Sequence, residues 1–168
     1  KQFTVRIDST SGGNGSGIII AKDGDTYTVL TAAHVVCEKQ PGTKPCKNYS
    51  YEILAPDGKK YPVEKSTIKT EEGVDLGVLK FKSQQDYQVA TLADYNPNKD
   101  DYMFTVGYPK LGNNSPWRFT LGRIFDKESG LLEIRQPDFQ SNGDSKLQAA
   151  SSLTGGYELV YTSITYSG

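Results

Sequence analysis

The stretch T-V-L-T-A-A-H-V-V at residues 28–36 holds the one histidine of the chain, His34, directly after a β-rich run. A second stretch, V-D-L-G-V-L-K-F at residues 74–81, surrounds Asp75 with apolar residues, so we expect a buried carboxylate there. An imidazole and a sequestered carboxylate are two of the three groups of a charge-relay site. We therefore expect a fold in which residues 34 and 75 lie close together.

Short runs of β-branched and aromatic residues recur along the chain, bounded by Gly, Pro, Asn or Asp, and few windows show a sustained helical period. These runs cover residues 3–7, 17–21, 27–31, 51–55, 75–81, 102–106, 117–125, 131–135 and 157–162. The turns D-G-D at residues 23–25 and P-D-G at residues 56–58 indicate antiparallel hairpins. The pattern predicts an all-β protein, a sandwich or a barrel, with one short helix near residues 146–151.

The β pattern loosens at residues 90–101, which read A-T-L-A-D-Y-N-P-N-K-D-D. A polar segment interrupted by proline is typical of a linker between folded units. We therefore predict a first β unit at residues 1–89, which carries His34 and Asp75, and a second β unit at residues 102–168.

Composition and charge bear on whether the protein binds nucleic acid, spans a membrane or carries a secretory signal. The chain has 19 Lys and Arg against 20 Asp and Glu and contains no basic run, so we expect no nucleic-acid partner. Its longest apolar stretch, residues 18–21, is far shorter than the roughly 20 residues that cross a bilayer, so we expect no membrane span. No secretory signal follows Lys1, which suggests a mature or trimmed product.

Two cysteines, Cys37 and Cys46, flank a turn-rich segment that contains Pro41, Gly42 and Pro45. A disulfide between them would restrict the unfolded chain by about 2.5–3 kcal/mol on the loop-entropy model. Such a bridge predicts an extracytoplasmic protein, secreted or periplasmic. Two unpaired thiols in a cytosolic loop are the alternative.

Neither a phosphate-binding loop nor a metal site is well supported. The glycine-rich residues 11–17 precede a β-type run, whereas a phosphate loop must open a helix, so a mobile hairpin connection is the better interpretation. His34, Cys37 and Cys46, with Glu38 nearby, lack the paired short spacings of structural zinc sites. We expect no metal and no cofactor.

With their flanks, the two stretches resemble the trypsin/chymotrypsin-like serine peptidases of the bacterial type. T-A-A-H at residues 31–34 and D-L-G-V-L-K-F at residues 75–81 match the histidine and aspartate motifs of that family, and 41 positions separate His34 from Asp75. G-S-G at residues 15–17, G-Y-P at residues 107–109 and the run 156–162 agree with the resemblance. The resemblance implies a chymotrypsin-like double antiparallel β-barrel and a peptide or protein substrate.

The resemblance also implies roles. His34 would be the general base and Asp75 the group that orients it, in the order His, Asp, Ser along the chain. No G-x-S-G-G-P motif, which carries the nucleophile in the family, occurs in the chain. The alternative function is a catalytically dead trypsin-like fold that serves as a binding or scaffold module.

The residues Y-T-S-I-T-Y-S-G at positions 161–168 fit the first eight positions of the bacterial pattern Y-T-N-x-T-x-P-G-M-S-G-G-P. In that register the serine lies two places beyond Gly168, and the Gly168 N–H belongs to the oxyanion hole. The competing register makes Ser167 the nucleophile. We therefore expect an incomplete second barrel, inactivity of the chain alone, and dependence on a downstream segment for the serine. Three explanations stay open: proteolytic processing after Gly168 with a C-terminal fragment still bound as a second chain, disorder or truncation of the remainder, or a natural pseudoenzyme. The first two are favoured.

Overall fold

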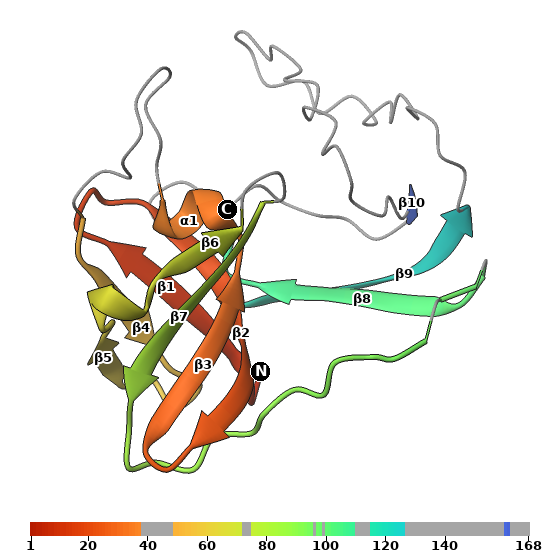
Figure 1. The fold of residues 1–168 in the computed structure, drawn as a ribbon. Helices are drawn as coiled ribbons and strands as arrows, with labels where there is room; N and C mark the ends of the chain where they lie inside the picture. Colours follow the sequence, from red (N-terminus) through yellow and green to blue (C-terminus); the bar gives the residue numbers. More distant parts are fainter. Residues whose placement is uncertain are drawn as a thin grey trace, which may run out of the picture.

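The computed structural model describes residues 1–37, 49–71, 75–95, 97–98, 100–109, 115–126 and 160–161. These residues form a seven-stranded and a three-stranded antiparallel sheet (Figure 1). The helical elements among them are α1 (Ala33–Val36) and the 3-10 turn η1 (Lys65–Thr67). In this part of the chain no helix has the length and apolar character to cross a membrane. The all-β prediction is confirmed.

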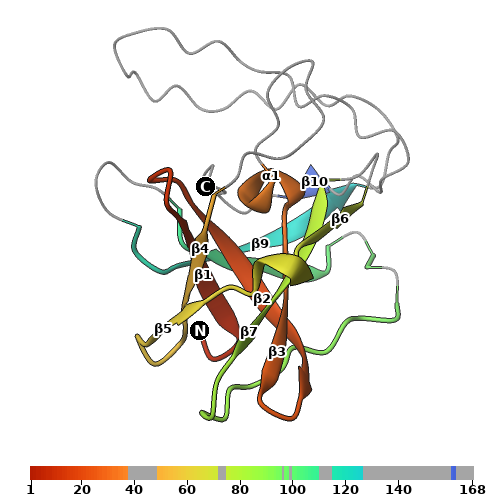
Figure 2. The ribbon, with the colours of Figure 1, turned by 60° about the vertical axis from the view of Figure 1, so that its left-hand side comes forward.

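The first sheet has the strand order β5-β4-β1-β2-β3-β7-β6. Its strands are β1 (Thr4–Ser9), β2 (Asn14–Asp23), β3 (Thr26–Thr31), β4 (Tyr51–Leu54), β5 (Lys60–Pro62), β6 (Lys69–Glu71) and β7 (Leu76–Lys82). The sheet curls on itself, because Val63, next to β5, forms a bridge to Phe81 in β7. The Glu64 N–H also donates to the Lys80 carbonyl at 3.1 Å. The result is a nearly closed barrel (Figure 2).

Alternating apolar residues of these strands fill the inside of the barrel. The fully buried side chains include Val5, Ile7, Ile19, Tyr27, Val29, Ile53, Leu79 and Phe81. Tyr27 stacks on Phe81, with ring centroids 5.3 Å apart. Its hydroxyl donates to the Gln85 carbonyl at 2.7 Å and accepts the Tyr87 N–H at 3.1 Å. This aromatic cluster ties the segment after β7 to the end of the barrel where β3 begins.

The second sheet has the order β10-β9-β8 and contains β8 (Tyr102–Gly107), β9 (Arg118–Asp126) and β10 (Val160–Tyr161). In the β8–β9 pair Thr105 lies opposite Thr120, and their hydroxyls are hydrogen-bonded at 2.6 Å. The C-terminal end of β8 lies against β1 and β2, while its N-terminal end extends away from the barrel (Figure 1).

Two of the strands in the first sheet were missed by the sequence prediction. β5 and β6 have three residues each and form the two edges of the sheet. Both alternate only between exposed and half-exposed side chains, so neither carries an apolar signal. Charged, short edge strands are a common way to block edge-to-edge association.

Strand boundaries near the glycine-rich segment also differ from the prediction. β2 begins at Asn14, not at residue 17, so the expected hairpin connection is partly strand. Gly15 pairs with Ile7 of β1, and a Cβ there would lie 2.5 Å from the Val35 methyl carbons, so the position requires glycine. The predicted run 131–135 and the predicted helix near residues 146–151 lie outside the described residues.

The packing of the barrel interior predicts how a core and a surface Phe→Ala substitution change the free energy of unfolding. Phe81→Ala should lower the free energy of unfolding by about 3–5 kcal/mol, because it leaves a cavity in a packed core. Phe104→Ala is the matched control, since Phe104 is 57% exposed where Phe81 is 1% exposed. It should cost less than about 1.5 kcal/mol, the contribution of one aromatic pair. Urea unfolding measures both, and equal losses would contradict the assignment of the core.

Candidate active site

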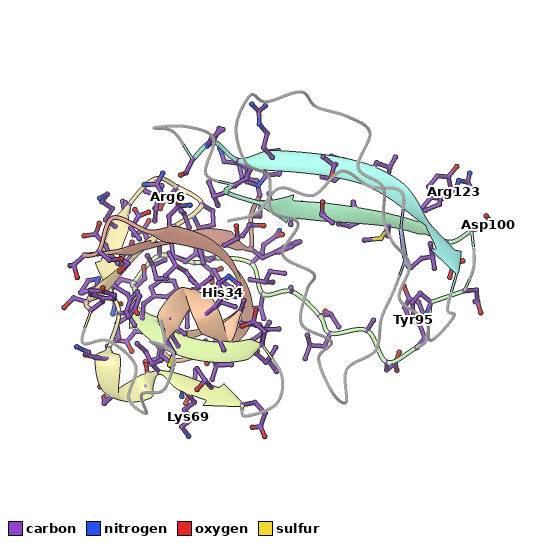
Figure 3. The ribbon with its side chains drawn as sticks, turned by 90° about the horizontal axis from the view of Figure 1, so that it is seen from above. Arg6, His34, Lys69, Tyr95, Asp100 and Arg123 are labelled. Carbon is purple, nitrogen blue, oxygen red and sulfur yellow. The ribbon has the colours of Figure 1, made fainter. Side chains whose placement is uncertain are left out.

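Helix α1 begins two residues after β3 and places His34 at one end of the barrel (Figure 3). The helix packs closely on β7. A Cβ at Gly77 would lie 3.1 Å from the Val36 Cγ2 and 3.3 Å from the Ala33 Cα. Val36, the last residue of the helix, has a buried side chain. The small residues on both sides therefore allow α1 to lie directly on the sheet.

Asp75 lies in the turn immediately before β7. β3 and β7 are antiparallel neighbours, and their register pairs Thr31 with Gly77. The end of β3 therefore lies beside the start of β7. This pairing brings His34 and Asp75 together although 41 positions separate them in the chain.

The Asp75 carboxylate contacts both the ring and the backbone of His34. Its Oδ2 lies 2.5 Å from the imidazole Nδ1. Its Oδ1 accepts the His34 backbone N–H at 2.9 Å. Helix α1 has no side-chain cap from its own N-terminal residue, so this distant carboxylate satisfies part of its first turn. One group thus fixes the orientation of the ring and of the helix that carries it.

Partial burial raises the pKa of the Asp75 carboxyl, but the hydrogen bonds from the His34 backbone and imidazole outweigh this effect. The net pKa lies below its ordinary value, so the carboxylate is ionised at neutral pH. An ionised partner at Nδ1 leaves Nε2 as the ring nitrogen that is able to accept a proton. The pair has the chemistry of a general base with an orienting acid.

The expected burial of Asp75 is wrong. Its side chain is 37% exposed and that of His34 is 64% exposed. The reason is that Asp75 belongs to a turn, not to the strand, which starts at Leu76. Leu76 itself is exposed, so the buried alternation begins only at Gly77.

Other predicted site residues lie partly outside the described residues. Cys37 ends α1, is 4% exposed, and donates its N–H to the Ala33 carbonyl at 2.8 Å. Cys46, Ser167 and Gly168 lie outside, so the disulfide and the oxyanion role stay predictions. In the part of the chain that the structure describes, no cluster of three or more His, Cys, Asp or Glu could hold a metal ion.

Residues 15–158 match the trypsin-like peptidase domain family. The chain belongs to this family. It is 33% identical over 147 residues to "Serine protease Do-like HtrA" of Lactococcus lactis subsp. lactis (strain IL1403), a match that covers 84% of this chain. The protein of the same name from Lactococcus lactis subsp. cremoris (strain MG1363) is 32% identical over 147 residues. The match spans 32% of the length of each of these curated relatives.

Membership of the trypsin-like peptidase domain family confirms the resemblance drawn from the two motifs. The seven-stranded sheet fits the first barrel of the chymotrypsin-like fold. The three-stranded sheet, in the part that the structure describes, makes up only a portion of a second barrel. Family and relatives together support a serine-peptidase function.

Neither helix α1 nor the contact of the Asp75 carboxylate with the His34 backbone was predicted from the sequence. A helix of four residues shows no periodic pattern, so propensity and periodicity could not have found it. Ala32 and Ala33 were the available signal, since small residues before His34 permit a tight turn onto β7.

The lowered pKa of Asp75 predicts how stability changes with pH. In acid the unfolded chain, with an Asp pKa of about 3.9, binds the proton before the folded protein does, so acidification destabilises the fold. The stabilisation from Asp75 should be complete above about pH 5 and should be lost as pH falls through the lower, folded-state pKa. Asp75→Asn should lack this dependence.

Urea unfolding of the native protein and of Asp75→Asn across this range measures the effect. The difference in unfolding free energy between them should narrow as pH falls from about 5 to below about 4. A difference that stays constant down to about pH 2 would contradict the ionised, hydrogen-bonded carboxylate.

Proposed function

We propose that this chain supplies the base and the orienting acid of a serine-type endopeptidase. The observation that carries the proposal is the contact of 2.5 Å between the His34 Nδ1 and the Asp75 Oδ2 at the end of the first barrel. The backbone contact of the same carboxylate with His34 supports it, because it holds the ring and the helix in one arrangement.

In the proposed reaction the His34 Nε2 takes the proton of the nucleophilic serine as its oxygen attacks the scissile carbonyl. The imidazolium then gives this proton to the leaving amine, and water repeats the cycle on the acyl-enzyme. Asp75 stays ionised throughout and stabilises the imidazolium, in agreement with its lowered pKa. Backbone N–H groups, among them that of Gly168, stabilise the oxyanion, each by about 3–4 kcal/mol.

The serine is proposed to lie outside the sequence of 168 residues. The absence of a G-x-S-G-G-P motif supports this, and in the proposed register of residues 161–168 the serine would follow Gly168 by two positions. Ser167 is the alternative nucleophile. In the proposed domain arrangement the first barrel spans residues 1–89, the linker 90–101 and the partial second barrel 102–168.

Peptides or proteins are the proposed substrates, in line with the named activity of the relatives, "Serine protease Do-like HtrA". A binding or scaffold module is the second candidate. The paired His34 and Asp75 favour the peptidase, because a module that only binds needs neither an exposed imidazole nor an ionised carboxylate aligned with it.

Covalent labelling tests the peptidase. A fluorophosphonate reacts with an activated serine, so the full-length protein should be labelled and should cleave an unfolded protein substrate. His34→Ala should lower both rates by at least about 10²-fold, the usual contribution of a positioned general base. Lys69→Ala is the control, since Lys69 lies exposed on edge strand β6. Undiminished activity in His34→Ala would refute the proposal.

The proposed position of the serine has its own test. A polypeptide of residues 1–168 should resist the fluorophosphonate, while the full-length protein reacts. Mass spectrometry under native conditions should show a C-terminal fragment bound to residues 1–168 if the protein is processed after Gly168. Labelling of the shorter polypeptide would instead assign Ser167 as the nucleophile.

A disulfide between Cys37 and Cys46 and an extracytoplasmic location are proposed together. The burial of Cys37 at the end of α1 supports a structural role for this residue. Alkylation under denaturing conditions should modify neither cysteine before reduction and both after reduction, as measured by intact mass. Modification of both without a reductant would contradict the bridge and, with it, the argument for location.

A further inference from the structure

The outer surface of β1 and β2 carries a set of polar side chains. The antiparallel register places Arg6 opposite Ser16 and Asp8 opposite Asn14, so these four side chains share one face. The residues between them face the buried interior of the barrel, because side chains alternate along a strand. Arg6 and Asp8 pair with each other through two contacts of 2.8 Å. Asn14 and Ser16 are hydrogen-bonded instead to the segment that follows β8.

Asn14 and Ser16 bind the backbone of Tyr108 from both sides. The Tyr108 N–H donates to the Ser16 Oγ at 2.7 Å, and the Asn14 Nδ2 donates to the Tyr108 carbonyl at 3.0 Å. The Ser115 hydroxyl donates to the Asn14 Oδ1 at 2.8 Å. Tyr108 is 6% exposed, so its backbone polar groups depend on these protein partners more than on water. We call these four residues the junction clamp.

The junction clamp is closely packed. A Cβ at Gly107 would lie 2.6 Å from the Ser16 Oγ, so this approach requires glycine. On the opposite face of the same part of β2, Gly15 contacts Val35 of α1. Residues 14–16 therefore lie between the helix that carries His34 and the segment that leaves the second sheet.

We propose that Asn14 and Ser16 are positioning residues of the peptidase reaction, because they fix the second sheet against the strand that supports the helix of His34. The inference rests on the proposed function, in which the second barrel carries the nucleophile. A base and a nucleophile on separate sheets react well only if the sheets keep their spacing. A displacement of about 1 Å costs about 10²-fold in rate.

Two substitutions of nearly equal shape isolate the hydrogen bond. Ser16→Thr keeps the hydroxyl that accepts the Tyr108 N–H, and Ser16→Val removes it. In the full-length protein, Ser16→Val should react with a fluorophosphonate about 10-fold more slowly than Ser16→Thr, although circular dichroism shows both to be folded. The Tyr108 amide should also exchange its hydrogen faster in Ser16→Val.

The pH dependence of kcat/KM distinguishes a loss of positioning from a change in the protonation behaviour of the general base. His34 and Asp75 both lie on the first barrel, so the apparent pKa of kcat/KM should be the same in Ser16→Val and Ser16→Thr. Only the plateau value of kcat/KM should be lower in Ser16→Val. Asn14→Ala removes the other half of the junction clamp and should show the same about 10-fold loss.

Tyr27→Phe is the matched control. Like Ser16, Tyr27 has a hydroxyl that accepts a backbone N–H, that of Tyr87 at 3.1 Å, but it lies where β3 begins. This variant should lose stability and keep the native labelling rate. A rate loss in Tyr27→Phe equal to that in Ser16→Val would show a general effect of destabilisation and overturn the inference.

The outcomes distinguish a failure of the positioning role from a failure of the proposed peptidase function. Equal labelling rates in Ser16→Val and Ser16→Thr, with a native rate in Asn14→Ala, refute the positioning role and leave the peptidase intact. If both Ser16 variants fail to fold, the rate of folded Asn14→Ala decides alone. Full reactivity of His34→Ala refutes the proposed function itself, whatever the variants of the junction clamp show.

Discussion

The antiparallel pairing of β3 with β7 is the interaction on which the site depends. It joins the strand before His34 to the strand after Asp75, and its register pairs Thr31 with Gly77. A shift of one residue would turn the side chains of a whole strand to the other face and bury the wrong set. The packing of the barrel core therefore also fixes the geometry of His34 and Asp75, because both depend on the same register.

The carboxylate of Asp75 connects the His34 ring to the helix that carries it. It accepts the backbone N–H of α1 and contacts the ring of His34, and its ionised state favours both contacts. β2 extends this arrangement to the second sheet, since Gly15 touches α1 while Ser16 holds Tyr108. The helix that carries His34 and the second sheet thus both contact β2.

Much of this arrangement could be predicted from the sequence, because it rests on local patterns. The alternation around Val29 and Leu79 identified the central strands, and the motifs around His34 and Asp75 identified the family. The edge strands β5 and β6 escaped because exposed positions carry no alternation. The exposure of Asp75 could not be predicted, because apolar neighbours in sequence, such as Leu76, do not belong to the core.

The four-residue length of α1 has a consequence for folding. Helix nucleation is unfavourable, so such a short helix has no stability of its own and exists only where other parts of the fold hold it. Its supports, Asp75 in the turn before β7 and Gly77 in β7, lie about 40 positions further along the chain, and contacts between distant segments form slowly. We therefore expect His34 to be aligned only after β3 and β7 have paired. In a partly folded chain whose β3 and β7 are still unpaired, the imidazole therefore lacks its carboxylate partner.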